Sequence, residues 1–263
     1  MKSSMDRKTL KVPFTLNTPK NWACPTCQSG VLRINGDTFH KDEIHNSRDH
    51  SHDGWDPDWI SLTFCCMLVC TNPHCKEIVS CAGVGTVDQD YVTDGNGEIE
   101  PEYRDFFTPR YFEPHLRLIE IPEGCPASVS ALLNESFKLF FCSPSPASNN
   151  VRMAIEELLT ELKVRRFNLV AKQRRFISLH QRIELLPSQH AQLKDLILAI
   201  KWLGNAGSHA NGMISMDDVM DSYDMFEHVL EQIYMPKTKK LRALAKRVNK
   251  NKGPVKKMTR PFF

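Results

Sequence analysis

Cys24-Pro25-Thr26-Cys27 is the sharpest local motif in the chain, and Cys70-Thr71-Asn72-Pro73-His74-Cys75 matches it downstream. Two cysteines three positions apart on a tight turn can direct both thiolates to one tetrahedral ion, at about 2.3 Å from each sulfur. The expected ligands of a structural Zn²⁺ are Cys24, Cys27, Cys70 and Cys75. Four protein ligands leave no open position for substrate or water, so this zinc would stabilise the fold and perform no chemistry.

The spacing of the two pairs leaves alternatives open. The second pair is separated by four residues instead of two, so His74 could replace one cysteine as a ligand. The stretch between the pairs exceeds the about 15–20 residues usual in such sites. A polar, His-rich insert at residues 39–58 accounts for the extra length. Without a metal, the pattern would be two unrelated cysteine pairs in a reduced protein.

Other metal-ligating side chains surround this motif. The insert suggests a second metal site or a metal nuclease, built from His40, His45, His50 and His52 with Asp49 and Asp53. Their spacing follows no helical or strand register, however, and we expect a mobile, solvated loop. The remaining cysteines lie in apolar contexts and are expected to fill the core: Cys65, Cys66, Cys81, Cys125 and Cys142.

Short β-strands are expected on both sides of the cysteine pairs. In residues 59–69, apolar side chains alternate on one face, which is typical of a half-buried strand: Ile60, Leu62, Phe64, Cys66 and Leu68. Residues 31–34 and 78–87 are two further predicted strands, and Asp94-Gly-Asn-Gly97 is a predicted turn. A Pro-marked linker is expected at residues 101–126.

From Ala127 onward the apolar period becomes that of helices. Helices are expected at residues 127–142, from Ser145-Pro146 through Leu162, and at 179–186, 189–203 and 216–235. Ser145 and Ser188 are the expected N-caps, Ser215 with Asp218 resembles a capping box, and Pro236 closes the last helix. The predicted class is α+β, a small antiparallel zinc-ribbon module (20–100), the linker (101–126) and an all-α four- or five-helix bundle (127–236).

Composition and charge limit the classes of function. The longest uninterrupted apolar run, Phe64 to Cys70, is far shorter than the roughly 18 residues that cross a bilayer. The first residues hold no apolar stretch of signal-peptide length, so we expect a cytoplasmic protein without membrane contact. Nine cysteines in such a protein favour metal or free thiols over disulfides.

The positive charge is concentrated at one end. The basic tail, residues 237–263, holds eleven Lys and Arg and no Asp or Glu, whereas the first 236 residues hold 23 basic against 31 acidic residues. Such a tail suits a polyanion, and nucleic acid is the partner we expect for it. The alternative is a solvated, disordered end that keeps the protein soluble.

Residues 201–209, Lys-Trp-Leu-Gly-Asn-Ala-Gly-Ser-His, end a predicted amphipathic helix. A histidine here could take a proton from a ribose hydroxyl, or Asn205 and His209 could simply bind free carbonyls at the helix end. Arg152 and Glu156, one turn apart on an earlier helix, form either a surface pair or a pair facing this segment. The candidates for a catalytic role from these residues are His209, Asn205, Arg152 and Glu156.

These residues resemble the family of domain of unknown function 4145. The resemblance rests on Ile121-Pro122…Cys125-Pro126, Arg152-Met-Ala-Ile-Glu156-Glu-Leu-Leu and Leu203-Gly-Asn-Ala-Gly-Ser-His209. A cysteine ribbon before such a domain is also similar to members of that family. The resemblance covers about residues 20–235, and leaves out the His-rich insert and the basic tail.

That family resembles the HEPN superfamily of helical bundles, many of which are metal-independent RNases of bacterial conflict and anti-phage systems. The resemblance implies that Asn205 matches the polar residue of their motif and His209 the catalytic histidine. The motif's arginine falls on Gly204, and losing such a preorganised group slows a reaction by about 10²–10³-fold. Lys201 and Arg152 are the candidates to replace it.

We therefore expect a module that binds nucleic acid or protein, with a homodimer through the helical bundle and, from the resemblance, a role in bacterial defence. The alternative is a metal-independent RNase that uses His209 as general acid/base. ATPase, metalloprotease and serine-hydrolase functions have no support, because the sequence lacks a phosphate-binding Gly-rich loop with its Lys, a His-Glu-x-x-His motif and a nucleophile elbow.

Overall fold

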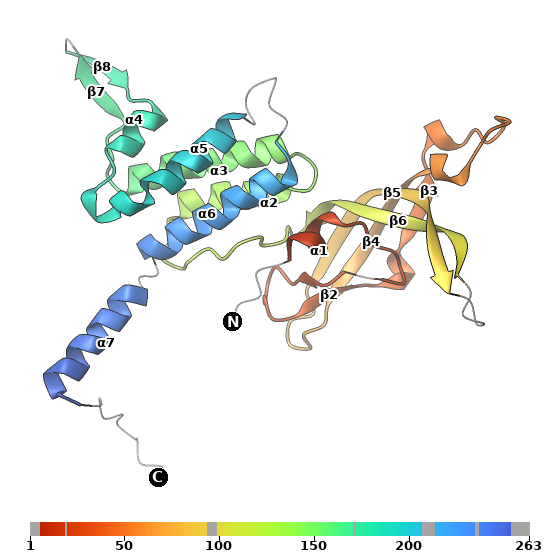
Figure 1. Cartoon of the computed structure of the whole chain (residues 1–263), viewed down its shortest axis with the longest axis horizontal. Coiled ribbons are helices and arrows are strands. Elements are labelled where there is room, and N and C mark those ends of the chain that lie inside the picture. The colour runs from red at the N-terminus through yellow and green to blue at the C-terminus, as the bar shows by residue number, and fades with distance from the viewer. Residues whose placement is uncertain are drawn as a thin grey trace.

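The computed structural model describes residues 6–18, 20–93, 99–170, 172–206, 214–234 and 237–253. An antiparallel sheet occupies one end of the long axis of the molecule, and the helices of the second half occupy the other end (Figure 1). The mixed α+β class predicted from the sequence is confirmed.

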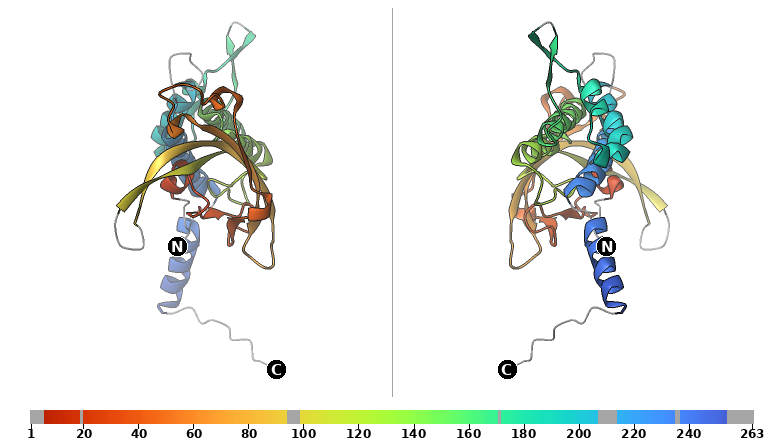
Figure 2. Two further views of the ribbon diagram at one scale, coloured as in Figure 1. Left: turned by 90° about the vertical axis from the view of Figure 1, so that its right-hand side faces the viewer. Right: turned by 90° about the vertical axis from the view of Figure 1, so that its left-hand side faces the viewer.

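The sheet has six strands in the order β1-β2-β4-β5-β6, with β3 also paired to β4. Every pairing is antiparallel. Figure 2 shows that the long strands of the sheet are strongly curved. The strands are β1 (Trp22–Ala23), β2 (Val31–Ile34), β3 (His40–Glu43), β4 (Ser61–Cys70), β5 (Ile78–Thr93) and β6 (Ile99–Glu113).

Strand β4 divides its side chains between the core and solvent, because successive side chains of a strand point to opposite faces. Four of the five positions that the alternation predicted are buried, namely Leu62, Phe64, Cys66 and Leu68, and Cys70 continues the pattern. Ile60 precedes the strand and is half-buried. Cys65 and Met67 point outward and are exposed. The expectation that Cys65 fills the core is therefore wrong, since its neighbour Cys66 takes the inner face.

An aromatic core lies under the sheet and continues into the helices. Phe14 packs edge-on against Trp22 and Phe64, with ring centroids 5.5 and 5.6 Å away. At the other end of this core, Phe112 of β6 contacts Phe141, with ring centroids 4.9 Å apart. The sheet and the helices thus share one buried apolar cluster, so we expect unfolding of one part to destabilise the other.

Two segments that were predicted to have no regular structure contain strands. Residues 101–113 of the predicted linker belong to β6, which pairs along β5 from Ser80 to Thr93. Pro109 is accommodated because β6 is an edge strand and the ladder with β5 shifts register beside Gly83. The insert also contributes β3, which pairs with β4, so residues 40–43 are not a loop. Solvent exposure of His40, His45, His50 and His52 is as expected.

The helices are α1 (Arg7–Lys11), α2 (Ala127–Leu139), α3 (Pro144–Glu161), α4 (Leu179–Glu184), α5 (Lys194–Ala206), α6 (Met216–Tyr234) and α7 (Lys237–Asn251). Helices α2, α3, α5 and α6 pack against one another, α4 lies against α5, and α7 projects away from them (Figure 1). A hairpin of β7 (Phe167–Val170) and β8 (Gln173–Phe176) precedes α4. In the described part of the chain, no helix has the length and apolar character to cross a membrane.

A buried hydrogen-bond chain joins three helices. Ser136 of α2 donates to the carbonyl oxygen of Ala147 in α3 at 2.7 Å, so its Oγ accepts from the Tyr223 hydroxyl of α6, also at 2.7 Å. Both side chains are almost fully buried. This chain satisfies the hydroxyls of Ser136 and Tyr223 and fixes the relative positions of α2, α3 and α6.

Helix boundaries follow the capping residues with two shifts. The reciprocal box at α6 is confirmed, with Ser215 N and Asp218 Oδ2 2.8 Å apart and Asp218 N and Ser215 Oγ 3.2 Å apart. Helix α3 begins two residues early, because Ser143 is its N-cap and Pro144 starts the first turn. Residues Ser188–Leu193 form a 3₁₀ turn, common at helix starts, so α5 begins only at Lys194. The predicted turn 94–97 and Pro236 lie outside the described residues.

The amino-terminal helix α1 binds the second-to-last helix. Arg7 forms ion pairs with Asp221, at 2.7 Å, and with Asp224 of α6. Lys11 pairs with Asp217 at 2.7 Å. The acidic side of α6 is therefore neutralised by basic side chains more than 200 positions away in the sequence.

Candidate metal centre

The first cysteine pair lies on the turn between β1 and β2. The backbone N–H of Cys24 donates to Gly30 O at 2.9 Å, and Gln28 N donates to Cys24 O at 3.0 Å. Gln28 has a positive φ of 53°, which turns the chain back after Cys27. The turn directs the N–H of Gly30 to the Cys27 sulfur, at 3.3 Å, so one backbone donor already stabilises a thiolate there.

The second pair repeats these features on the turn between β4 and β5. Cys70 is the last residue of β4, and the N–H of Asn72 donates to its sulfur at 3.4 Å. Lys76, directly after Cys75, has a positive φ of 50°. The two turns are joined by hydrogen bonds at 2.9 Å from Thr71 N to Val31 O and at 3.1 Å from Val31 N to Thr71 Oγ1.

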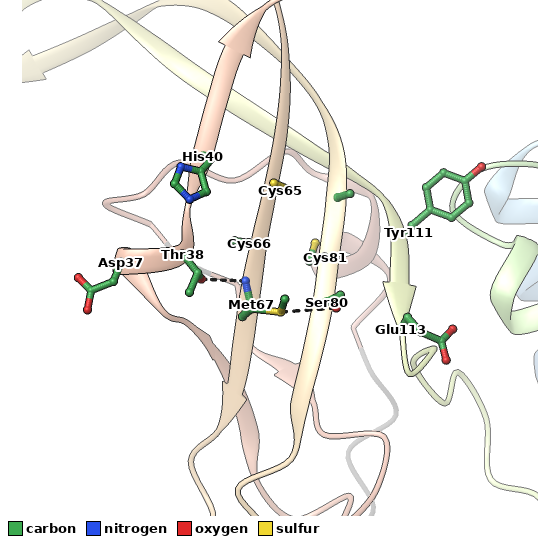
Figure 3. A pocket seen from close by; sticks show the side chains of 11 residues that line it. Asp37, Thr38, His40, Cys65, Cys66, Met67, Ser80, Cys81, Tyr111 and Glu113 are labelled. Atoms are coloured by element: carbon green, nitrogen blue, oxygen red, sulfur yellow. Dashed lines mark hydrogen bonds between the residues drawn. The ribbon is translucent and has the colours of Figure 1, made fainter.

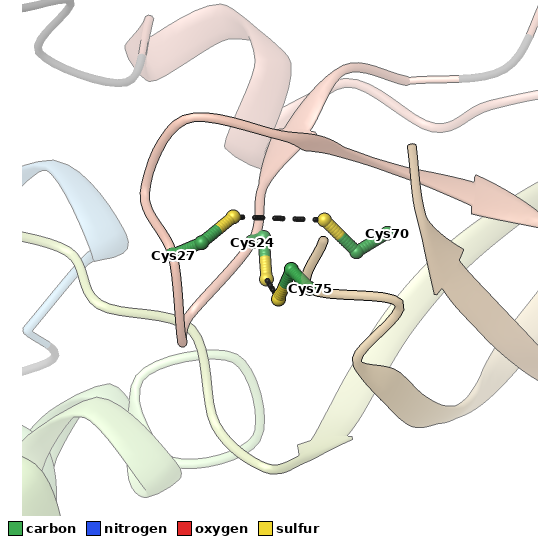
Figure 4. Close-up of side chains that lie close together, drawn as sticks. All are labelled: Cys24, Cys27, Cys70 and Cys75. Atoms are coloured by element: carbon green, nitrogen blue, oxygen red, sulfur yellow. Dashed lines mark hydrogen bonds between the residues drawn. The ribbon is translucent and has the colours of Figure 1, made fainter. Parts of the chain in front are cut away.

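The four cysteine sulfurs converge between the two turns (Figure 4). All four lie within 4.8 Å of one another. Cys24 Sγ and Cys75 Sγ are 3.8 Å apart, and Cys27 Sγ and Cys70 Sγ are 3.7 Å apart. Sulfurs at about 2.3 Å from a central ion occupy tetrahedron corners about 3.8 Å apart, whereas a disulfide needs about 2.05 Å. The separations fit shared coordination of one ion and exclude two disulfides.

The environment of the sulfurs differs from one side to the other. Hydrogen bonding by Ser29 lowers the pKa of the Cys27 thiol to about 5, which favours its thiolate form. Burial raises the pKa of Cys70 to about 12. A bound cation removes the proton from a coordinating thiol, so it would hold all four groups as thiolates. Four thiolates are a donor set selected by soft or borderline ions such as Zn²⁺ and the iron of iron–sulfur clusters.

Gly30 completes the centre, although its role was not predicted from the sequence. A Cβ at this position would lie 2.4 Å from the Cys70 sulfur, a separation too short for any other residue type. Its place three residues after Cys27 is the signal that would have identified it. His74, the alternative ligand, is exposed and is not among the clustered ligand atoms.

The His-rich insert forms no comparable cluster. Within the described residues, which include all of 39–58, the four cysteines are the only group of His, Cys, Asp and Glu side chains placed to share an ion. His50 Nε2 lies 3.0 Å from Glu43 Oε1, and its ring lies 4.4 Å from that of Trp55. The insert is therefore held by local contacts, and the metal nuclease considered for it has no site.

A pocket of about 390 Å³ lies on the outer face of the sheet, over β3, β4, β5 and β6 (Figure 3). The residues that line it include His40, Met67, Ser80, Tyr111 and Glu113. Of the candidate metal ligands named from the sequence, His40 lines it, whereas the four clustered cysteines and the candidate catalytic residues of the described chain do not. The pocket lies on the face of the sheet opposite to the buried side chains of β4.

The structure places part of the predicted catalytic set together. Arg152 Nη1 donates to Glu156 Oε1 at 2.5 Å, and Arg152 Nε donates to Asn149 Oδ1 at 3.2 Å. Lys201 is 8% exposed, and its ammonium lies 3.3 Å from the centre of the Trp202 ring. Asn205 is half-buried in the last turn of α5, and His209 lies outside the described residues.

Arg152 also explains why residue 204 is glycine. A Cβ on Gly204 would lie 2.5 Å from Cβ and 3.1 Å from Cγ of Arg152, so the stem of Arg152 fills the space beside α5. An arginine at position 204, where the resemblance would place one, would collide with the Arg152 side chain. The stem of Arg152 on α3 thus contacts Gly204, the residue before Asn205 on α5.

This packing makes Gly204→Ala a destabilising change. Both colliding atoms belong to the start of the Arg152 side chain, which cannot swing away without moving α3, so we expect unfolding free energy to fall by about 1–3 kcal/mol. Urea denaturation followed by circular dichroism measures this loss. Gly36→Ala is the matched control, since a Cβ there meets no atom within 4 Å. Equal stability of the two variants would contradict the tight α3–α5 contact.

Two families of uncharacterised domains match the chain. The domain of unknown function DUF8608 matches residues 12–112, and the domain of unknown function DUF4145 matches residues 134–251. The predicted resemblance to DUF4145 is confirmed for the helical part. It does not extend to the cysteine-containing sheet, which matches a different family, and it does include α7 of the basic tail. No curated protein and no solved structure matches the chain.

Proposed function

We propose that this protein binds nucleic acid without cleaving it, and that Zn²⁺ holds its sheet together as a zinc ribbon. In this proposal the helical part is a HEPN-like bundle that carries the basic helix α7. The single observation that supports binding most directly is α7 itself, a helix of 15 residues with seven Lys and Arg and no acidic residue.

The position of α7 suits contact with a large polyanion. The helix projects from the rest of the molecule (Figure 2), and residues 244–250 are all exposed. The first 236 residues carry an excess of acidic side chains, so a polyanion would be attracted to α7 and repelled by much of the remaining surface. Leu244 and Val248, one turn apart, form an apolar strip along this otherwise cationic helix.

Zinc is the ion we propose for the cysteine centre. Four thiolates at tetrahedral spacing are a closed, structural donor set, and the two turns they join hold β1, β2, β4 and β5 together. Cys24, Cys27, Cys70 and Cys75 would hold the ion, which supplies structural stabilisation only.

Neutralising three cations of α7 tests the proposed binding. The variant carries Lys246→Gln, Arg247→Gln and Lys250→Gln, and its matched control carries Leu244→Ala and Val248→Ala on the apolar strip. Each phosphate contact contributes about 0.7–0.9 to the slope of log affinity against log salt, so we expect this slope to fall by about 2 and affinity at physiological salt to fall at least tenfold. Fluorescence anisotropy with labelled RNA and DNA measures both. An unchanged slope would contradict the assignment of α7.

The RNase alternative is favoured by one observation: the stem of Arg152 packs on Gly204, so a side chain that ends in a guanidinium contacts the residue before Asn205. That guanidinium is already engaged by Glu156 and Asn149, which is why we place binding first. The same RNA, recovered after incubation with EDTA and separated on a denaturing gel, distinguishes the two. RNA that stays intact with the wild type supports binding without cleavage. RNA that the wild type cleaves and the His209→Ala variant does not cleave supports the RNase alternative.

A further inference from the structure

The hairpin β7–β8 is a second basic element, and it projects from the helices at a point remote from α7 (Figure 1). Residues 163–176 contain six Lys and Arg and no acidic residue: Lys163, Arg165, Arg166, Lys172, Arg174 and Arg175. All six are exposed. Only Arg166 has an acidic neighbour, Glu157 at 3.9 Å, among the ion pairs of the described residues. The hairpin therefore concentrates positive charge on a mostly acidic body.

One face of the hairpin is aromatic. Phe167 pairs with Phe176 and Leu169 with Arg174 across the two strands, which places these four side chains on the same face. The two phenylalanine rings have centroids 4.4 Å apart, and the Arg174 guanidinium lies 4.1 Å from the centre of the Phe167 ring. Phe176 is 77% exposed and Leu169 is 76% exposed.

The exposure of the Phe176 and Leu169 side chains does not stabilise the hairpin. An isolated two-stranded hairpin is marginally stable, and apolar side chains normally stabilise it by packing against a third strand or a helix. Here nothing covers the outer side of Phe176 in the described structure. An open ring flanked by guanidinium groups is instead the combination that stacks on a nucleobase while cations contact the neighbouring phosphates.

We propose that the β7–β8 hairpin binds single-stranded nucleic acid, with a base stacked on Phe176 and the adjacent phosphates bound by Arg174, on the same face, and by Arg166. Unpaired bases expose their ring faces, whereas those of a duplex are covered by their neighbours. A membrane surface fits less well, because the aromatic pair lies at the base of the hairpin and the cationic Lys172 lies at its turn. The inference rests on the proposed nucleic-acid binding, but assigns it a surface separate from α7.

The test compares Phe176→Ala with Tyr91→Ala, a matched control in which another exposed aromatic, 67% accessible on β5, is removed. The probes are a fluorescein-labelled 12-nucleotide oligo-dT, the corresponding oligo-U and a blunt 12-base-pair duplex, each followed by anisotropy with the full-length protein. We expect Phe176→Ala to weaken binding of the single strands about tenfold, with duplex binding and the Tyr91→Ala variant unchanged.

Phe176→Trp keeps the inference testable if alanine disturbs the hairpin. An indole stacks at least as well as a phenyl ring, so we expect binding equal to or tighter than that of the wild type, with quenching of the added tryptophan fluorescence by the single strands. Arg175→Gln, on the opposite face from Phe176, should weaken single-strand and duplex binding to the same small extent.

The outcomes separate this inference from the proposed function. If Phe176→Ala binds single strands as tightly as the wild type, or loses duplex binding equally, the inference is wrong, while loss of binding in the α7 variant still supports the proposed function. If the wild type binds neither single strand nor duplex, both proposals fail. Binding to phosphatidylglycerol vesicles in place of the oligonucleotides would identify the hairpin as a membrane contact and overturn the inference.

Discussion

Cys70→Ser is expected to unfold the sheet and to abolish stoichiometric zinc in the purified protein. Cys70 is 4% exposed and ends β4, the strand that pairs with β2, β3 and β5. A structural zinc in a small domain contributes about 10–16 kcal/mol of apparent binding free energy, as much as the 5–15 kcal/mol that stabilises a typical domain. Loss of one of four ligands should therefore eliminate most of the net stability of this part of the chain. Metal analysis by mass spectrometry and thermal circular dichroism measure the two effects.

Cys65→Ser is the matched control, because Cys65 lies on the same strand but points outward to solvent. We expect this variant to retain one zinc per chain and a melting temperature close to that of the wild type. Addition of a strong chelator to the wild type should reproduce the loss seen for Cys70→Ser. Full zinc occupancy and unaltered melting of Cys70→Ser would show that the sulfurs are close for another reason.

Arg182→Met is expected to give the second largest loss, about 3 kcal/mol of unfolding free energy. Arg182 is 3% exposed in α4 and donates to Glu156 O at 3.1 Å, Thr160 Oγ1 at 2.9 Å and Val164 O at 3.4 Å. Methionine has a comparable length but donates no hydrogen bond, so buried acceptors at the end of α3 lose their partner. Burial also lowers the pKa of Arg182.

Urea denaturation measures the unfolding free energy of Arg182→Met, and Arg175→Met is the matched control. Arg175 is exposed on β8, so its replacement should change the unfolding free energy by less than about 0.5 kcal/mol. Arg182 ties α4, which follows the hairpin, to α3, which precedes it. We therefore also expect increased hydrogen exchange in the hairpin of Arg182→Met. A loss no greater than that of Arg175→Met would mean that the three bonds contribute little.

The features predicted correctly from the sequence are those whose cause is local. The turn around Cys24 and Cys27 follows from their spacing, the burial of β4 from its alternation, and the start of α6 from the Ser215–Asp218 box. Each depends on residues within one or two turns of chain. The pairing of distant partners, Cys24 with Cys75 above all, needed the additional assumption of a shared ion.

The features missed depend on tertiary context. Pro101 and Pro109 argue against a strand unless that strand lies at an edge, and edge position is visible only once β5 has been placed. The hairpin strands have four residues each and bury no face, so they carry no periodic pattern. Arg182 looks ordinary in sequence, because its importance comes from the groups on α3 that surround it. Gly204 stands out in the sequence, but its packing against Arg152 is visible only in the structure.

The ion pairs between α1 and α6 have a consequence for synthesis on the ribosome. Translation adds about 5–20 residues per second, so Arg7 waits at least about 10 s before Asp221 and Asp224 exist. All strands of the sheet are encoded before residue 114 and can assemble during this interval, but the first helix cannot dock. A nascent chain stalled before residue 216 should therefore leave its leading segment accessible to protease, and release of the complete chain should protect it.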